Sequence, residues 1–152
     1  MKIGQQYIES LRQIHPKVYA FGELIESVAD SPITRPHVNC AAMTYQLACE
    51  PEYENLMTAT SHLTGKKINR FTHIHQSTED LVKKVKMLRM IAQKTGSCFQ
   101  RCVGCDAMNA AYTTIYELDQ AKGTHYFDRL VKFIEYVQEN DLMVAGAMTD
   151  PK

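Results

Sequence analysis

Three cysteines lie close together in residues 97–105, which read SCFQRCVGC. If this segment is helical, Cys98 and Cys102 are one turn apart, and their side chains project from the same face roughly 5–6 Å from each other. Two thiolates at that separation can bind one metal ion or one iron–sulfur cluster, whose irons prefer soft ligands. The remaining ligands must then come from elsewhere. Cys105 follows Cys102 by about one helical turn and has no obvious place in the pair.

A packed helix is the alternative explanation for these cysteines, because free cysteine is among the most buried residue types. The Cys-x-x-x-Cys spacing is less specific than paired Cys-x-x-Cys motifs, and it differs from the spacing of thioredoxin-like redox sites. The residues alone therefore leave two possibilities open, a pair of metal ligands or two core thiols. Cys40 and Cys49 are far from this segment in the sequence, and we expect both to be core residues.

Two other polar groups are weaker candidates for chemistry. His73 and His75 are separated by one residue, so on a helix their rings would point apart. We expect them in a polar connection, where they hold backbone groups or water. The basic residues between positions 83 and 89 are expected on a solvated helix face, with contact to the phosphates of a nucleotide-like ligand as the alternative. No glycine-rich phosphate loop, Gly-x-Ser-x-Gly elbow or His-Glu-x-x-His motif occurs.

The elements that must position these residues are predicted from the spacing of apolar side chains. Seven glycines and five prolines in 152 residues are few, which favours helices with few turns. Apolar residues recur at helical spacing through most of the chain, while residues 55–76 are polar and irregular. Ser77 is expected to cap the clearest helix. The predicted fold class is all-α, with helices around residues 7–11, 18–28, 36–49, 77–92, 98–118 and 127–137.

Composition and charge exclude several classes of function. A length of 152 residues predicts one domain, and 17 basic residues balance 17 acidic ones, so the charge indicates no nucleic-acid partner. The longest segment without charged residues, Pro36–Cys49, is too short to span a membrane, and the N-terminus lacks the apolar core of a signal peptide. We expect a soluble, cytoplasmic protein with no membrane partner, whose five cysteines do not form a disulfide framework.

The spacing of apolar residues stops being helical near the end of the sequence. Residues 1–141 are expected to form the α-helical domain, and residues 142–152 an extended segment that enters something else. This segment begins with the short apolar run LMVAGAM and ends with MTDPK, which has turn chemistry. The chain is therefore expected to be one part of a longer protein.

Several stretches resemble one branch of the 4-hydroxyphenylacetate 3-hydroxylase family of flavoproteins, namely the 4-hydroxybutyryl-CoA dehydratase/vinylacetyl-CoA isomerase branch. These stretches include QYIESLR, VYAFGE, INRF, HQST, SCFQRCVG and GAMTDPK, and the resemblance covers essentially the whole chain. The SCFQRCVG element is specific to the dehydratase branch, because the hydroxylases have no cysteine pair there. The resemblance implies a fold similar to acyl-CoA dehydrogenases, with this helical N-terminal domain, a β middle domain, a helical C-terminal bundle and a homotetrameric assembly.

The resemblance also implies an FAD and a 4Fe–4S cluster, with the CoA-thioester substrate bound between them. Cys98 and Cys102 match two cluster ligands of the family, and the other two, one His and one Cys, belong to the middle domain. Gln100 and Arg101 lie between the two cysteines and are expected to line the catalytic site. Cys105 stands where the family is expected to have methionine.

The reaction implied by the resemblance is dehydration of 4-hydroxybutyryl-CoA to crotonyl-CoA and isomerisation of vinylacetyl-CoA by a flavin radical mechanism. The general base is expected beyond residue 152, so the chain alone should be inactive. Two alternatives are a flavin-dependent 4-hydroxyphenylacetate 3-hydroxylase, which needs no cluster, and a non-catalytic helical oligomerisation fragment, which would not bind FAD. The residues matching the start of the family's FAD-contacting segment are Met148, Thr149, Asp150, Pro151 and Lys152.

Overall fold

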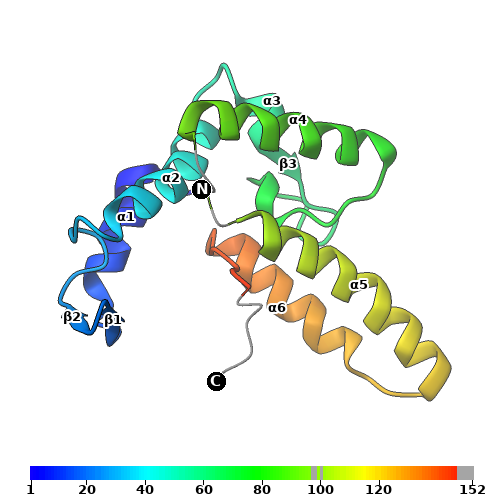
Figure 1. Ribbon diagram of the computed structural model, residues 1–152. Helices are drawn as coiled ribbons and strands as arrows, with labels where there is room; N and C mark the ends of the chain where they lie inside the picture. The colour runs from blue at the N-terminus through cyan, green and yellow to red at the C-terminus, as the bar shows by residue number, and fades with distance from the viewer. Residues whose placement is uncertain (97–98, 100, 147–152) are drawn as a thin grey trace.

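A computed structural model describes residues 1–96, 99 and 101–146 of the chain (Figure 1). These residues form a helix-rich body, as the sequence predicts, but they also contain two short antiparallel hairpins that the sequence does not predict. In chain order the elements are α1 (Gly4–Gln13), β1 (Val18–Ala20), β2 (Glu23–Ile25), α2 (Arg35–Gln46), η1 (Leu47–Cys49), α3 (Glu54–Met57), β3 (Thr58–Thr60), β4 (Lys67–Asn69), η2 (Arg70–Thr72), α4 (Thr78–Thr95), α5 (Cys102–Lys122) and α6 (Phe127–Glu139).

The best-predicted element is helix α4, which has a sequence marker at each end. The Ser77 hydroxyl accepts a hydrogen bond from the Asp80 N–H at 3.2 Å, which is the N-cap expected from its position. Gly96 closes the helix in the left-handed conformation with φ of 62°, where glycine has no steric penalty. Helix α2 also begins as predicted, with Pro36 in its first turn, and it continues into the short 3₁₀ helix η1.

The predicted helix over residues 18–28 is wrong, because strands β1 and β2 form a hairpin there. Val18 pairs with Ile25 and Ala20 pairs with Glu23. The two residues between the strands, Phe21 and Gly22, have φ values of 53° and 85°. Positive φ at both central residues is the requirement of a tight hairpin turn that matches the twist of the strands. The apolar residues of this segment therefore alternate across a ribbon instead of lining one helix face.

Two neighbouring clusters form the hydrophobic core. The first lies under α4 and includes Met87 and Ile91, which pack with Phe71 of η2 and with η1. The second lies between α5 and α6, which run antiparallel beside each other (Figure 1), and it includes Ile134 and Val137. The polar segment predicted over residues 55–76 supplies parts of both clusters through α3, η2 and the connection that follows. No helix within the described residues is both long enough and apolar enough to cross a membrane.

Candidate cofactor site at the start of helix α5

Helix α5 begins at Cys102, with Arg101 as its N-cap residue. The predicted helix over residues 98–118 therefore starts later than expected, because Phe99 and Arg101 are not helical. The predicted site residues Cys98, Gln100 and 148–152 lie outside the described part of the chain, so their predicted roles stay predictions. Arg101 and Cys102 are the predicted site residues whose surroundings the structure describes.

Cys102 is a free, half-buried thiol in the first turn of α5, packed against the core cluster under α4. The amino end of a helix favours a negatively charged group. The position of Cys102 is therefore suited to a soft metal ligand. Within residues 1–96, 99 and 101–146, no three His, Cys, Asp or Glu side chains gather closely enough to hold a metal ion. A cluster bound through Cys102 would need its other ligands from outside these residues.

The other cysteines differ in burial. Cys105 is 1% exposed, and burial raises the pKa of its thiol to about 11, which leaves it protonated at neutral pH. Cys40 is half-buried against the first core cluster, in agreement with its expected core position. Cys49 is exposed, so its predicted core position is wrong. The chain turns from η1 towards solvent there, and the Cys49 thiol donates to the Lys2 carbonyl at 3.5 Å.

Arg101 is 2% exposed, and its guanidinium makes its contacts inside the domain. It donates to Thr44 Oγ1 at 3.2 Å, to Asp141 Oδ1 at 3.3 Å and to the Leu142 carbonyl at 3.3 Å. Its Cζ atom also lies 4.2 Å from the centre of the Tyr45 ring. Arg101 therefore links the start of α5 to α2 and to the segment after α6, while a direct place in the catalytic site stays a prediction.

The segment over residues 142–146 runs closely over the first turn of α5 without helical or strand structure. Its backbone comes so near that a Cβ added at Gly104 would lie 1.8 Å from the Val144 carbonyl oxygen. A Cβ added at Gly146 would lie 2.6 Å from Val103 Cγ1. We call these two approaches the glycine contact. It places the residues just before the predicted FAD-contacting segment beside the helical turn that carries Cys102.

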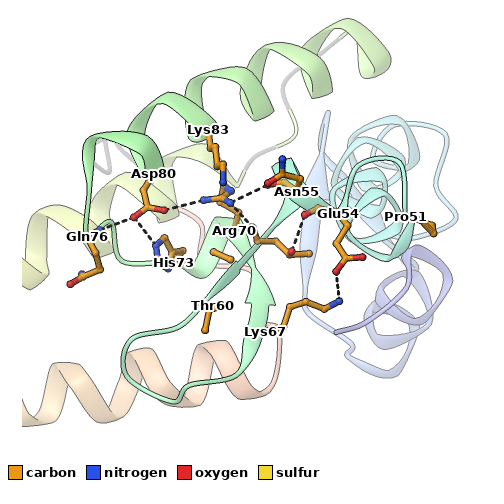
Figure 2. Close-up of a pocket in the computed structure, with 12 residues that line it drawn as sticks. Pro51, Glu54, Asn55, Thr60, Lys67, Arg70, His73, Gln76, Asp80 and Lys83 are labelled. Carbon is orange, nitrogen blue, oxygen red and sulfur yellow. Dashed lines mark hydrogen bonds and ion pairs between the residues drawn. The ribbon is translucent and has the colours of Figure 1, made fainter.

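An ion-pair network around Asp80 lies at the start of α4 (Figure 2). Asp80 accepts from Gln76 N–H at 3.0 Å, from His73 Nε2 at 3.2 Å and from Arg70 at 3.3 Å, with the Ser77 hydroxyl nearby at 3.2 Å. Burial alone would raise the pKa of Asp80, but the hydrogen bonds from Gln76 and His73 outweigh it and hold that pKa at about 2.

This network lines an open cavity of about 650 Å³. The cationic groups around it already have anionic partners: Lys67 lies 2.6 Å from Glu54, and Lys83 lies 2.9 Å from Glu79. The arrangement therefore stabilises the α4 end of the fold and leaves these lysines paired rather than free for an anionic ligand. The expected solvated face is therefore wrong for Lys83 and Lys84, which are half-buried and pair with Glu79 and Asp106. Lys86 and Arg89 are exposed, as the sequence favours.

Asn109 holds the connection that contains the two histidines, a role that the sequence gave no reason to expect. Its amide oxygen accepts from the His75 N–H at 2.8 Å, and its amide nitrogen donates to the carbonyls of His73 and Cys105. The predicted connection at these histidines is confirmed, although His73 is buried rather than solvated. Both ring nitrogens of His75 are buried without a hydrogen-bond partner among the described residues. Burial, His73 and Lys84 lower the pKa of His75, which favours its neutral ring.

Comparison with known proteins gives one family and close relatives. The chain is 60% identical over 149 residues to the 4-hydroxybutyryl-CoA dehydratase/vinylacetyl-CoA-Δ-isomerase of Clostridium aminobutyricum, which covers 98% of this chain and 30% of that protein. It superposes on an oxygen-tolerant archaeal 4-hydroxybutyryl-CoA dehydratase from N. maritimus with a TM-score of 0.94 and 50% identity, covering 99% of this chain and 30% of that one.

A more distant likeness joins the chain to a hydroxylase. The oxygenase component of 4-hydroxyphenylacetate 3-monooxygenase in complex with FAD gives a TM-score of 0.70 at 22% identity, over 94% of this chain and 29% of that chain. This likeness shows a shared fold. The chain thus spans about 30% of the length of its curated dehydratase relative. The sequence profile described as "4-hydroxyphenylacetate 3-hydroxylase N terminal" matches residues 3–152, and the chain therefore belongs to that family.

Proposed function

We propose that this chain is the N-terminal part of a lyase and isomerase that dehydrates 4-hydroxybutyryl-CoA to crotonyl-CoA and isomerises vinylacetyl-CoA. The observation that carries the proposal is the 60% identity to the Clostridium aminobutyricum enzyme across 98% of the chain. The identity to the monooxygenase component is 22%, at which a likeness argues for fold rather than substrate. The substrate is then a CoA thioester.

The proposed cofactors are FAD and a 4Fe–4S cluster. Cys98 and Cys102 would hold the cluster from this side, and residues 148–152 would contact the flavin, whose presence in the monooxygenase relative supports this assignment. When bound, the two groups supply the Lewis-acid and electron-transfer chemistry that removal of a hydroxyl group and an unactivated hydrogen requires. Cys102 fits the cluster because it is a free thiol in the first turn of a helix.

The residues of this chain then bind and orient the cofactors, and the substrate proton is removed by a residue elsewhere in the protein. Cys102 holds one edge of the cluster, Gln100 lines the site, and Arg101 fixes the backbone next to Cys102 from inside the domain. The buried thiol of Cys105 stays a spectator, because burial favours its protonated form. The general base belongs to a part of the protein after residue 152.

The proposed architecture of the whole protein is that of acyl-CoA dehydrogenases. Residues 1–141 form its helical N-terminal domain, residues 142–152 lead into a β middle domain, and a helical bundle follows. Four copies would assemble into a cytoplasmic homotetramer. The helix-rich body and the non-helical path of residues 142–146 support this arrangement.

An assay of the full-length protein under anaerobic conditions tests the proposed function. We expect the protein to convert both 4-hydroxybutyryl-CoA and vinylacetyl-CoA to crotonyl-CoA. Chromatography of the thioesters measures both conversions. A protein that hydroxylates 4-hydroxyphenylacetate with reduced flavin and oxygen, and dehydrates neither thioester, would establish the hydroxylase alternative instead. A protein that binds no FAD and turns over none of these substrates would establish the oligomerisation fragment.

A further inference from the structure

The geometry points to a positioning role for Arg101 and Gly104: together they fix residues 142–146, which lead to the proposed flavin-binding residues, against the turn of α5 that carries the proposed cluster ligand Cys102. The inference rests on the proposed function, because it concerns the two cofactors of that reaction. Beyond that function, Arg101 and Gly104 set the position of residues 142–146 relative to the turn that carries Cys102.

Arg101 provides the polar half of this attachment. Its guanidinium donates both to Asp141 and to the Leu142 carbonyl, at 3.3 Å each, so it binds the residues where the segment begins. Asp141 is itself buried, and its other oxygen accepts from the Lys2 N–H at 2.9 Å. Arg101 directly precedes Cys102, so this one residue connects the segment to the turn that carries the proposed ligand.

Close packing at two glycines provides the other half of this attachment. At Gly104 the segment approaches so closely that any side chain would meet the Val144 backbone, and at Gly146 a side chain would meet Val103. At Gly104 the neighbouring atoms are backbone, which is far less able to move aside than the end of a side chain, so this position tolerates no added carbon. One side of the contact lies in the turn that carries Cys102, and the other lies just before the proposed flavin-binding residues.

Two features of the sequence make this arrangement specific. Glycine is a poor residue for a helix interior, and alanine would favour α5 more, so close packing is the physical reason for glycine at position 104. Lysine at position 101 would keep the charge but would lose the forked donors that reach Thr44, Asp141 and Leu142 together. Each substitution therefore disturbs the attachment in a different way.

The test compares the full-length holoenzyme with its Gly104→Ala and Arg101→Lys variants. We expect the dissociation constant for FAD, measured by flavin fluorescence, to rise at least about tenfold in each variant, a change of about 1.4 kcal/mol. The iron content should stay close to that of the wild type, because Cys98 and Cys102 are untouched. Thr44→Val, which removes one Arg101 acceptor without adding bulk, is the milder variant and should weaken FAD binding in the same direction.

Arg70→Lys is the matched control for loss of a buried arginine. Arg70 is 3% exposed and donates to the carbonyls of Leu56 and Asn55, without contact to residues 142–146. This variant should lower the melting temperature and leave the FAD dissociation constant within about twofold. If Gly104→Ala and Thr44→Val keep wild-type FAD affinity, or if Arg70→Lys weakens FAD as much as they do, the positioning role is wrong.

Amide hydrogen exchange separates this inference from the proposed function. A wild-type protein that retains neither FAD nor iron would overturn the proposed function. The attachment would still be measured, because residues 142–146 should exchange faster in Gly104→Ala than in wild type or Arg70→Lys. Equal exchange in all three proteins would overturn the attachment.

Discussion

At the scale of single residues, two buried arginines organise the polar interior of this domain. Arg70 is 3% exposed and pairs with Asp80, while Arg101 pairs with Asp141. Each guanidinium also donates to backbone carbonyls, which the five donors of arginine make possible. Removing one partner of such an ion pair is strongly destabilising, because the charge of the other partner is then buried without compensation.

The acid end of the pH range tests the Asp80 network. The pKa of Asp80 is held near 2, below its usual 3.8, so its ionised form stabilises the fold above about pH 4 and this contribution is lost as the pH falls towards 2. Asp80→Asn should lower the free energy of unfolding by about 2 kcal/mol at pH 7 and flatten its decrease between pH 4 and 2. Urea unfolding of the 152-residue chain across this range is the measurement.

Asp106→Asn is the control for that substitution. Asp106 pairs with Lys84 at the surface and is 57% exposed, so its loss should change the free energy of unfolding by less than about 1 kcal/mol. An Asp80→Asn chain with the acid sensitivity of the wild type would contradict the role given to the Asp80 network.

At the scale of elements, the hairpin of β1 and β2 carries an aromatic residue in an unfavourable place. Phe21 is 94% exposed and has a φ of 53°, a region that costs residues with a Cβ roughly 1–2 kcal/mol. Asparagine tolerates this conformation better. Phe21→Asn should therefore raise the melting temperature of the 152-residue chain by a few degrees, as recorded by circular dichroism.

Tyr19→Asn in the neighbouring strand is the control for the hairpin. Tyr19 is also exposed, but it has ordinary strand geometry, so this substitution should bring no gain in melting temperature. A fall in melting temperature for Phe21→Asn would mean that the Phe21 ring contributes contacts larger than the backbone penalty.

The elements show which parts of the fold the sequence could predict. Helix α4 was predictable because Ser77 and Gly96 mark its ends through local hydrogen bonds and backbone freedom. The first hairpin was not, because its apolar spacing also matches a helix and a positive φ at Phe21 has no marker in that residue type. The start of α5 was missed because it carries no local marker: its N-cap residue Arg101 makes no side-chain capping bond and instead binds Thr44 and Asp141, which are distant in the sequence.

At the candidate site the sequence predicts which residues to consider, while their burial and packing could not be predicted. The residue types of SCFQRC left metal ligands and core thiols both open, and the family resemblance pointed to Cys102 as a ligand. Burial of Cys105 and exposure of Cys49 depend on tertiary packing, so composition could not distinguish them. The role of Gly104 could not be predicted for the same reason, since it depends on Val144, which follows the rest of α5 and the whole of α6 in the sequence.

At the scale of the whole molecule, this chain is one domain whose proposed site is completed from outside it. Cys102 stands at the amino end of α5, and no described group of three ligands surrounds it. Residues 142–146 run over the same turn towards the proposed flavin-binding segment. Under the proposed function, the chain would present one edge of a cluster and the approach to a flavin to the rest of the protein.

The iron and acid-labile sulfide of the anaerobically purified full-length protein test this account most directly, compared among wild type, Cys102→Ser and Cys105→Ser. We expect the iron and sulfide of a 4Fe–4S cluster in wild type and in Cys105→Ser, because the buried Cys105 thiol is a spectator. Cys102→Ser should lose most of its iron and sulfide. Cys102→Ser protein with the iron and sulfide of the wild type, or a wild-type protein without iron, would contradict it.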